Sequence, residues 1–463
     1  MKQPNIVFFF TDDQRFDTIH ALGHAAIQTP NMDRLVARGT TFTHAHIPGG
    51  TCGAVCMPSR AMLHSGRSLF HLDREGQQIP QAHTTLGQAL REHGYRTFAT
   101  GKWHNGKESF NRSFADGADI FFGGMTDHWN VPAHNYDLSG QYSTKLPRCK
   151  DPMNSKEVRY RNADHITPGL HSSEMVCQAG IEFIKQQDGK DPFFAYISFL
   201  APHDPRVMPE RFQQMYDPND IELPPNFAGG HPFDTGALRI RDEELASFPR
   251  SPEEVKEHIA DYYAMISHLD YELGRVIRVL EEKGMLDDTI IVFAGDNGLA
   301  IGQHGLFGKQ NCYEHSVRVP LIFAGPGVPE GKQSDAYAYL FDIFPTLCGL
   351  VDIPVPESVE GKDLSVCMRH EDEKNRDTLY FAYAGTQRAV KDRQYKLIEY
   401  AVAGRERQTQ LFDLMHDPWE TRNLATHPDY EGKCTELREE MARLRDEWGD
   451  KQHPLGEKFW HLY

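Results

Sequence analysis

Short runs of apolar, β-branched and aromatic residues alternate along the chain with segments whose apolar positions have a helical period. The runs predict buried strands over residues 5–10, 95–100, 193–200, 289–295 and 319–324. Strands that alternate with helices are typical of an α/β fold. We therefore predict a large, mostly parallel sheet sandwiched by helices.

Two helices carry clear start and stop patterns. Thr85-Leu86-Gly87-Gln88 has the pattern of a capping box, and Gly94 follows as a stop. Ser251-Pro252-Glu253-Glu254 combines an N-cap serine, a proline in the first helical position and an acidic first turn. Apolar residues then recur on one face up to Gly284, which predicts a long amphipathic helix.

The pattern changes after about residue 350, where Ile353-Pro354-Val355-Pro356 has the composition of a connector. The following segments predict short strands over 378–383, 387–390, 394–400 and 410–414, and then a helix over about 430–448. This pattern indicates a small antiparallel sheet with one helix. We therefore divide the chain into a large domain over 1–365 and a C-terminal subdomain over 366–463, because 463 residues are too many for one hydrophobic core.

Charge and composition limit the classes of partner. The chain has 49 Lys and Arg against 66 Asp and Glu, a net charge of −17. Such a field repels nucleic acid and anionic membrane surfaces, so we expect neither as a partner, and an anionic substrate would need a local basic pocket. The 8 cysteines form no Cys-x-x-Cys pair, so we expect mostly buried free thiols.

The first apolar run is too short for a signal peptide and is followed by Asp12-Asp13 rather than a cleavage site. No apolar run approaches the roughly 20 residues of a membrane span. We expect a cytoplasmic protein if Met1 is the native start, and a periplasmic or secreted one if a signal peptide was removed.

Polar residues with catalytic or metal-binding side chains follow four of the predicted strands. They are Asp12-Asp13, Lys102 with His104, His203, and Asp296-Asn297. In open α/β sheets, ligands bind at the carboxyl ends of the strands, so these four clusters predict one shared site. Taken singly, each cluster is more often a solvated turn or a structural histidine.

Cys56-Met57-Pro58-Ser59-Arg60 lies between a Gly-rich stretch and a helical pattern that begins near Ala61. A nucleophile at a helix start is favoured by backbone N–H groups and the helix dipole. Arg60 could then bind an anion through both guanidinium nitrogens.

Cys56-x-Pro-Ser-Arg60, followed by Leu63, Gly66 and Arg67, resembles the signature of the type I sulfatases of the alkaline phosphatase superfamily. Six further segments are similar to family motifs, in the family order: Pro4 to Gln14, Thr29 to Leu35, Gly101-Lys102-Trp103-His104, Pro202-His203-Asp204-Pro205, Gly295-Asp296-Asn297-Gly298, and Gly308-Lys309 with Tyr313-Glu314 and Arg318 to Leu321. The tail around Leu411 to Leu414 is also similar. An ordered set of this size favours the functional interpretation over coincidence.

The resemblance implies an alkaline-phosphatase-like fold and hydrolysis of sulfate esters. It implies that a formylglycine-generating or sulfatase-maturating enzyme oxidises Cys56 to formylglycine, whose hydrated aldehyde attacks sulfur. Arg60, Lys102 and Lys309 would neutralise charge on the sulfate and the leaving group. As in the family, His203 would protonate the leaving alcohol, and His104 would take a proton from residue 56 to release sulfate.

The candidate metal ligands Asp12, Asp13, Asp296 and Asn297 offer hard oxygens, which suit Ca²⁺ or Mg²⁺. The resemblance favours Ca²⁺ and adds the oxidised residue 56 as a further ligand. The metal would lower the pKa of the hydrated aldehyde and hold a sulfate oxygen. Two histidine pairs, His20 with His24 and His44 with His46, could mimic zinc ligands, but no third ligand of fitting spacing is evident.

The substrate is expected to be a sulfated small molecule or saccharide, with an O-sulfate on a sugar as the preferred choice. The segment 123–142 is rich in aromatic and polar residues that could contact a sugar ring, although such segments are as often packing clusters. Candidate substrate contacts are His71, His128, Trp129, His134 and His315. His315 stands where many family members have glycine, and Asn105 where many have leucine, so both positions could alter the pocket.

Two other functions remain open at this point. A phosphonate monoester or phosphodiester hydrolase could share the Cys-x-Pro-Ser-Arg signature, and relative turnover of matched sulfate, phosphate and phosphonate esters would separate the two. A non-catalytic binder of sulfated glycans would result if Cys56 were left unoxidised.

Overall fold

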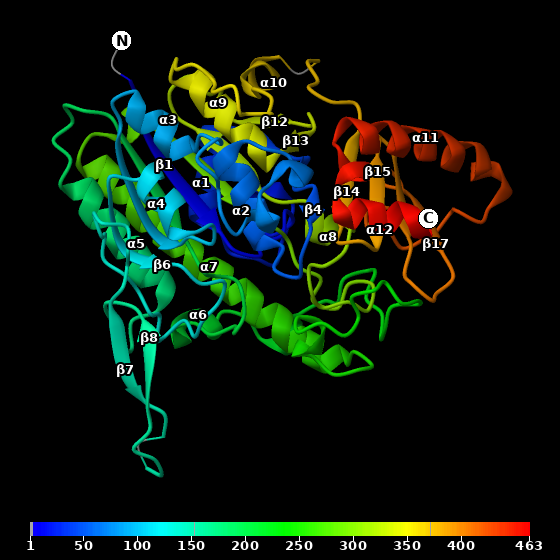
Figure 1. The fold of residues 1–463 in the computed structure, drawn as a ribbon, viewed down its shortest axis with the longest axis horizontal. Helices are drawn as coiled ribbons and strands as arrows, with labels where there is room; N and C mark the ends of the chain where they lie inside the picture. The colour runs from blue at the N-terminus through cyan, green and yellow to red at the C-terminus, as the bar shows by residue number, and fades with distance from the viewer. Residues whose placement is uncertain (1–2, 152, 371) are drawn as a thin grey trace.

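The computed structural model describes residues 3–151, 153–370 and 372–463. A mixed sheet of eight strands forms its centre (Figure 1). In spatial order the strands are β12 (Lys332–Ser334), β2 (Gly39–Phe42), β11 (Leu321–Ala324), β10 (Thr289–Gly295), β1 (Asn5–Thr11), β9 (Phe193–Ser198), β5 (Arg96–Lys102) and β6 (Asp116–Phe121).

The five strands from β10 to β6 run parallel, which confirms the predicted α/β class. The predicted strand at 319–324 is shorter than expected, beginning at Leu321, and it runs antiparallel to β10. Strands β2 and β12 extend the sheet beyond it. The sequence did not predict them because each is a run of three or four residues with little apolar character.

Alternate residues of β1 enter two separate hydrophobic cores. Phe8 and Phe10 belong to the core that also contains residues of α2 (Cys56–Ser65), α3 (Leu86–Glu92), α4 (Lys107–Ser113) and α9 (Ile343–Leu350). Val7 and Phe9 belong to the other core, with α1 (Pro30–Arg38), α5 (Ser172–Lys185) and α7 (Pro252–Glu282). Because successive strand residues point to opposite faces, a fully apolar strand requires helices on both sides.

The predicted helix starts are present. Ser251 Oγ accepts a hydrogen bond of 3.3 Å from the Glu254 backbone N–H at the start of α7. Thr85 Oγ1 does the same for Gln88 at the start of α3, at 3.2 Å. The predicted capping box is only half formed, because the Gln88 side chain donates to Glu92 instead of returning to the cap.

The C-terminal residues form the predicted antiparallel sheet. Its strands are β14 (Leu379–Tyr383), β15 (Gln387–Lys391), β16 (Tyr395–Tyr400) and β17 (Gln408–Asp413), and α11 (Glu431–Glu447) packs against it (Figure 1). A short strand from the first domain, β4 (Gly49–Gly50), pairs parallel with β14. The same hydrophobic core reaches from β1 into this sheet. The division after residue 365 stays a prediction.

The remaining α-helices and strands are short. They are the helices α6 (Glu210–Gln213), α8 (Glu314–Val317), α10 (Ser365–Arg369) and α12 (Pro454–Leu462), the pair β3 (Ala45–His46) with β13 (Ala338–Tyr339), and the ribbon of β7 (Lys145–Cys149) with β8 (Val158–Asn162). The ribbon projects away from the body (Figure 1). Among the helices of the described residues, none combines the length and apolarity needed to cross a membrane.

Candidate active site

The carboxyl ends of four neighbouring strands, β10, β1, β9 and β5, bring the predicted motifs together. The residues that gather there are Asp12 and Asp13 after β1, Asp296 and Asn297 after β10, His203 after β9, and Lys102 at the end of β5. Gly101 precedes Lys102 with a φ of +82°, and a Cβ at this position would lie 1.8 Å from the Ser198 carbonyl oxygen. Only glycine permits this approach of β5 to β9.

Cys56 begins α2 and lies at the centre of the site. Its Sγ is 3.4 Å from Lys102 Nζ and 3.5 Å from His104 Nδ1. The side chain is buried, and burial raises the pKa of Cys56 to about 11 although Lys102 and Lys309 act in the opposite direction. Before any metal binds, residue 56 is therefore a thiol rather than a thiolate.

Arg60 lies one turn further along α2 and is buried beneath the site. Its Nε donates to Asp296 at 2.8 Å, and one terminal nitrogen donates to Ser198 Oγ at 2.7 Å. The other terminal nitrogen is 3.7 Å from Asp12 Oδ2. These contacts orient the two carboxylates, because a guanidinium presents its donors in a fixed planar fork.

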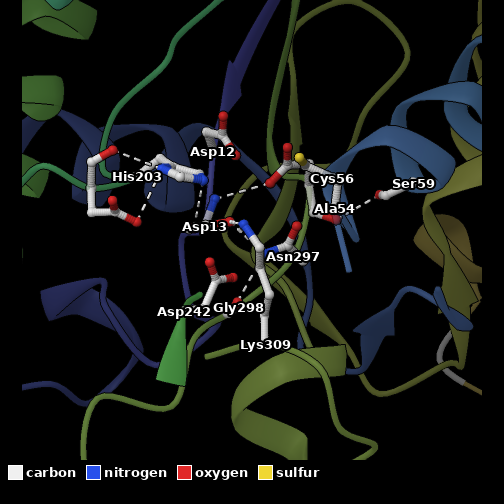
Figure 2. A network of polar contacts seen from close by, with 12 residues as sticks. Asp12, Asp13, Ala54, Cys56, Ser59, His203, Asp242, Asn297, Gly298 and Lys309 are labelled. Carbon is white, nitrogen blue, oxygen red and sulfur yellow. Dashed lines mark hydrogen bonds and ion pairs between the residues drawn. The ribbon is translucent and has the colours of Figure 1, made fainter. Parts of the chain in front are cut away.

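Asp13 adopts a positive φ of 67°, in the left-handed region that non-glycine residues rarely occupy. Its carboxylate accepts hydrogen bonds of 2.6 Å from both Lys309 Nζ and Asn297 Nδ2 (Figure 2). Its backbone N–H donates to Asp296 Oδ1 at 2.9 Å. The strained backbone is therefore held by charged and polar partners from two separate segments.

His203 lies beside Asp13 (Figure 2). Its ring is held by the neighbouring residue, Asp204. Nδ1 of His203 is 2.8 Å from the Asp204 backbone oxygen, and Nε2 is 3.7 Å from Asp13 Oδ2. Because the carbonyl can only accept, it places a proton on Nδ1. Nε2 is then the nitrogen that faces the site.

Several polar atoms fit a bound cation. Asp12, Cys56 and Asp296 form a possible metal-binding group, with one ligand atom from each lying within 4.8 Å of the others. Among the described residues, the buried oxygens Asp12 Oδ1 and Asn297 Oδ1 have no hydrogen-bond partner. Buried oxygens without partners are costly, and a hard cation would satisfy both.

Burial and neighbouring charges shift the pKa values of the ionisable side chains in the site. Burial raises the pKa of Asp296 to about 7, and the neighbouring Asp12 adds to this effect. Burial also acts to raise the pKa of Asp13, but Lys309 and His203 outweigh it and hold the pKa below its ordinary value. The carboxylates keep the pKa of Lys309 well above its usual range despite burial, so this side chain stays cationic.

A pocket of about 250 Å³ opens above these residues. It is lined by Cys56, His104, His203 and Lys309, together with Gly53, Ala54, Gly124, Met125, Ile240, Arg241, Asp242 and Gln310. A substrate in this pocket would contact the nucleophile position, both histidines and one lysine at once. The lining residues do not include Arg60, which supports the orienting role of that side chain.

The five predicted substrate contacts lie outside the residues that line this pocket in the described structure. His128 is buried behind His203, where its ring contacts the His203 carbonyl at 2.9 Å and Ser172 Oγ at 2.6 Å. Trp129 packs edge-on against the His171 ring. His128 therefore supports the segment that carries His203.

The other three have partners outside the pocket lining. Nδ1 of His71 is 2.7 Å from Glu360. His134 packs beside Tyr142 and is 3.6 Å from Asp164. His315 is buried in α8 next to Tyr313. A role of these residues in substrate binding stays a prediction.

The pocket wall contains polar residues that the sequence did not indicate. Asp242 accepts hydrogen bonds from Gln310 Nε2 at 2.6 Å and from Arg241 at 3.2 Å. Arg241 in turn binds the carboxylate of Asp204. These residues lie in long connections without periodic apolar positions, so only the folded chain brings them to the pocket.

The histidine pairs considered for zinc have other partners. Nδ1 of His20 is 3.2 Å from Asp33, and Nε2 of His24 is 2.9 Å from the Tyr263 hydroxyl. His46 contacts Lys391 and Glu314. Over the described part of the chain, neither pair belongs to a cluster of possible metal ligands.

A family model described as Sulfatase matches residues 4–353, three quarters of the chain and all of the site. The chain belongs to the sulfatase family. A second model, described as N-sulphoglucosamine sulphohydrolase, C-terminal, matches residues 302–447 of this sulfatase. The family assignment makes it a sulfuric ester hydrolase of the alkaline phosphatase superfamily and confirms the resemblance seen in the sequence.

Relatives match this sulfatase over nearly its whole length. An arylsulfatase of Clostridium perfringens is 29% identical, covering 95% of this chain and 94% of its own. An N-acetylglucosamine-6-O-sulfatase of Bacteroides thetaiotaomicron is 23% identical, covering 97% and 87%.

Solved structures share the fold. BT4656, in complex with D-glucosamine-2-N,6-O-disulfate, has a TM-score of 0.76 at 21% identity, with 98% of this chain and 99% of that chain covered. The phosphonate monoester hydrolase of Agrobacterium radiobacter has a TM-score of 0.74 at 22% identity, with 96% of each chain covered.

Proposed function

We propose that this sulfatase hydrolyses an O-sulfate ester on a saccharide, using a formylglycine made from Cys56 and a bound Ca²⁺, with Mg²⁺ as the second choice. The observation that carries the proposal is the position of Cys56. Its Sγ lies on the pocket floor, within reach of Lys102 and His104 and beside the oxygens of Asp12 and Asp296. A separate maturation enzyme would supply the oxidation.

The nucleophile position gains its chemistry from this oxidation. The Sγ atom marks where an oxygen of the oxidised residue would stand. When formed, the hydrated aldehyde supplies one hydroxyl for attack on sulfur and a second for release of sulfate. His104 is placed for the second role, because its Nδ1 lies 3.5 Å from Sγ of residue 56. Burial and Lys102 lower the pKa of His104, so its ring is neutral.

The metal would be held by Asp12, Asp13, Asp296 and Asn297. The two unpartnered oxygens and the absence of sulfur or imidazole among these four side chains suit a hard cation. When bound, the ion would supply a positive charge that polarises the sulfate and favours the ionised nucleophile. Arg60 keeps Asp296 in place for this purpose.

Lys102 and Lys309 would bind the transferring sulfate. Both are buried, and Lys309 lines the pocket. Charge on the sulfate oxygens and on the leaving group grows during the reaction, and two fixed ammonium groups in a dry site stabilise it. His203 would act as the imidazolium and donate the proton on Nε2 to the leaving alcohol. Burial and Lys309 lower the pKa of His203, whereas the carboxylates of Asp13 and Asp204 favour the cationic ring that this step requires.

A sugar as leaving group is supported by two observations. The pocket wall presents the carboxylate of Asp242 and the amide of Gln310, which can bind sugar hydroxyls. Relatives of this chain include an N-acetylglucosamine-6-O-sulfatase, and a structure with the same fold contains D-glucosamine-2-N,6-O-disulfate.

A phosphonate monoester or phosphodiester hydrolase is the second candidate, because the phosphonate monoester hydrolase of Agrobacterium radiobacter has the same fold. Turnover of matched nitrophenyl sulfate, phosphate and phenylphosphonate esters by the matured enzyme tests the choice. We expect the highest kcat/KM on the sulfate. A kcat/KM on the phosphonate above that on the sulfate would overturn the proposal.

A further inference from the structure

The β7–β8 ribbon differs in charge from the rest of the molecule. Between residues 145 and 162 the sequence has six basic residues and two acidic ones, whereas the whole chain has a net charge of −17. The basic residues are Lys145, Arg148, Lys150, Lys156, Arg159 and Arg161, and the acidic ones are Asp151 and Glu157. A local positive surface on an acidic protein attracts an anionic partner.

Arginine side chains gather on one face of this ribbon. In the antiparallel register Arg148 lies directly opposite Arg159, and Leu146 lies opposite Arg161. Directly opposed residues share a face, so all three arginines project to the same side. The opposite face carries Pro147 with Tyr160 and Cys149 with Val158. We call the first side the arginine face.

The arginine face carries unbalanced charge. Like charges directly opposite one another destabilise a two-stranded ribbon. Glu157 is 3.2 Å from Arg159, but it also pairs with Lys150. Arg148 and Arg159 are exposed and Arg161 is half-buried, so the described structure leaves the first two arginines open to a partner from solvent.

The arginine face begins at the rim of the active-site pocket. Arg161 donates a hydrogen bond of 3.4 Å to Thr126 Oγ1. Thr126 directly follows Gly124 and Met125, which line the pocket, and a Cβ on Gly124 would lie 2.9 Å from the His104 ring. From this rim the ribbon extends away from the body (Figure 1).

We propose that the arginine face binds the sulfate groups of a polysulfated saccharide chain whose terminal sugar occupies the active-site pocket. The proposal rests on the proposed sulfatase function and adds the substrate class. Arginines two residues apart on a strand are separated by about 7 Å, a spacing over which one chain with several sulfates can contact both. Guanidinium groups bind sulfate-like oxyanions through two parallel hydrogen bonds.

A heparin tetrasaccharide labelled with a fluorophore is a suitable probe, with binding followed by fluorescence anisotropy. We expect the double variant Arg148→Gln/Arg159→Gln to raise the Kd of the probe about tenfold, because two exposed charged contacts are lost. The double variant Lys145→Gln/Lys156→Gln removes the same charge from the opposite face and from the connection between the two strands, and it serves as the matched control. It should change the Kd less than twofold.

The same variants are assayed for turnover of nitrophenyl sulfate, which is too small to reach the ribbon. Both should keep the kcat/KM of the parent enzyme, and the tetrasaccharide should inhibit the control more strongly than the arginine variant. Equal Kd values for the two double variants would overturn the ribbon proposal while leaving sulfatase activity intact. If the matured parent enzyme did not turn over nitrophenyl sulfate, the result would instead contradict the proposed function.

A second copy of this acidic chain is the alternative partner of the ribbon. Sedimentation of the parent and of both double variants distinguishes it. A change of molar mass in the arginine variant, without a change in the Kd of the probe, would overturn the saccharide proposal.

Discussion

The carboxylate of Asp204 accepts hydrogen bonds from both terminal nitrogens of Arg241, one of them at 2.8 Å. The same carboxylate lies 3.3 Å from Nδ1 of His203. Because Arg241 lines the pocket, one ion pair connects the pocket wall to the ring proposed as the general acid.

This ion pair makes Arg241 a positioning residue for His203. We expect Arg241→Gln to lower kcat on a sugar sulfate about tenfold, because a misaligned proton donor loses part of its catalytic effect. Asp204→Ala should give a similar loss, and the double variant should be no worse than either single one. Additive losses would show that Arg241 acts by binding substrate and not through Asp204.

The leaving group decides how much His203 matters. A sugar alcohol must be protonated as it departs, whereas nitrophenolate leaves readily without a proton. We therefore expect His203→Ala to lose about 10²–10⁴-fold on a sugar sulfate and much less on nitrophenyl sulfate.

His104→Ala is the comparison for this experiment, since His104 acts on residue 56 and should affect both esters alike. Measuring kcat for both variants on both esters gives the required ratios. An equal loss on the two esters for His203→Ala would mean that the acid lies elsewhere.

Removal of the metal should lower both activity and stability. Without the ion, Asp12, Asp13 and Asp296 are left as a buried acidic cluster. The buried oxygens Asp12 Oδ1 and Asn297 Oδ1 then have no hydrogen-bond partner among the described residues. An ion present at 100 times its Kd contributes about 2.7 kcal/mol, or about 3 °C in Tm for a chain of this size.

Calorimetry with and without a chelator measures this effect on Tm. Asp296→Asn should remove the response to Ca²⁺, while replacement of the exposed Asp429 by Asn should preserve it. A chelated parent enzyme with unchanged Tm and activity would contradict the metal site.

The contact between His71 and Glu360 predicts a dependence of stability on pH. Burial acts to raise the pKa of Glu360, but hydrogen bonds from His71 and Ser68 lower it to about 2. A lowered pKa in the folded state gives stability that is complete above the unfolded pKa near 4.5 and is lost as the pH falls toward 2.

Glu360→Gln should therefore lower the free energy of unfolding by about 1–2 kcal/mol at pH 7, allowing for partial exposure of the group. The difference from the parent should shrink between pH 4.5 and pH 2. Denaturant unfolding at several pH values measures it. A difference that is constant over this range would exclude the ionised carboxylate of Glu360 as its source.

The sequence predicted the residues at the ends of the strands better than it predicted the residues of the pocket wall. Asp12, His203 and Asp296 follow apolar strands, and parallel strands place such residues at one edge of the sheet, so their meeting could be foreseen. Arg241 and Asp242 lie in a connection without hydrophobic periodicity, and no local pattern indicates where it folds.

The edge strand β4 also could not be predicted from the local sequence. Gly49 and Gly50 form β4 and pair with β14, yet two glycines carry no strand propensity. Their conformation is determined by the close approach of the partner strand, since a Cβ on Gly49 would lie 2.0 Å from the Ala382 carbonyl oxygen. Such pairings depend on tertiary contacts, so the local sequence does not predict them.

The chemical state of residue 56 decides whether the proposed mechanism holds. The most direct measurement is mass spectrometry of the peptide that contains Cys56, produced with and without a sulfatase-maturating enzyme, combined with turnover of nitrophenyl sulfate by both samples. We expect a mass corresponding to replacement of the thiol by an aldehyde in the co-produced sample, multiple turnover by that sample, and none by Cys56→Ala. Full turnover by a sample whose residue 56 remains an unmodified thiol would contradict the proposed mechanism.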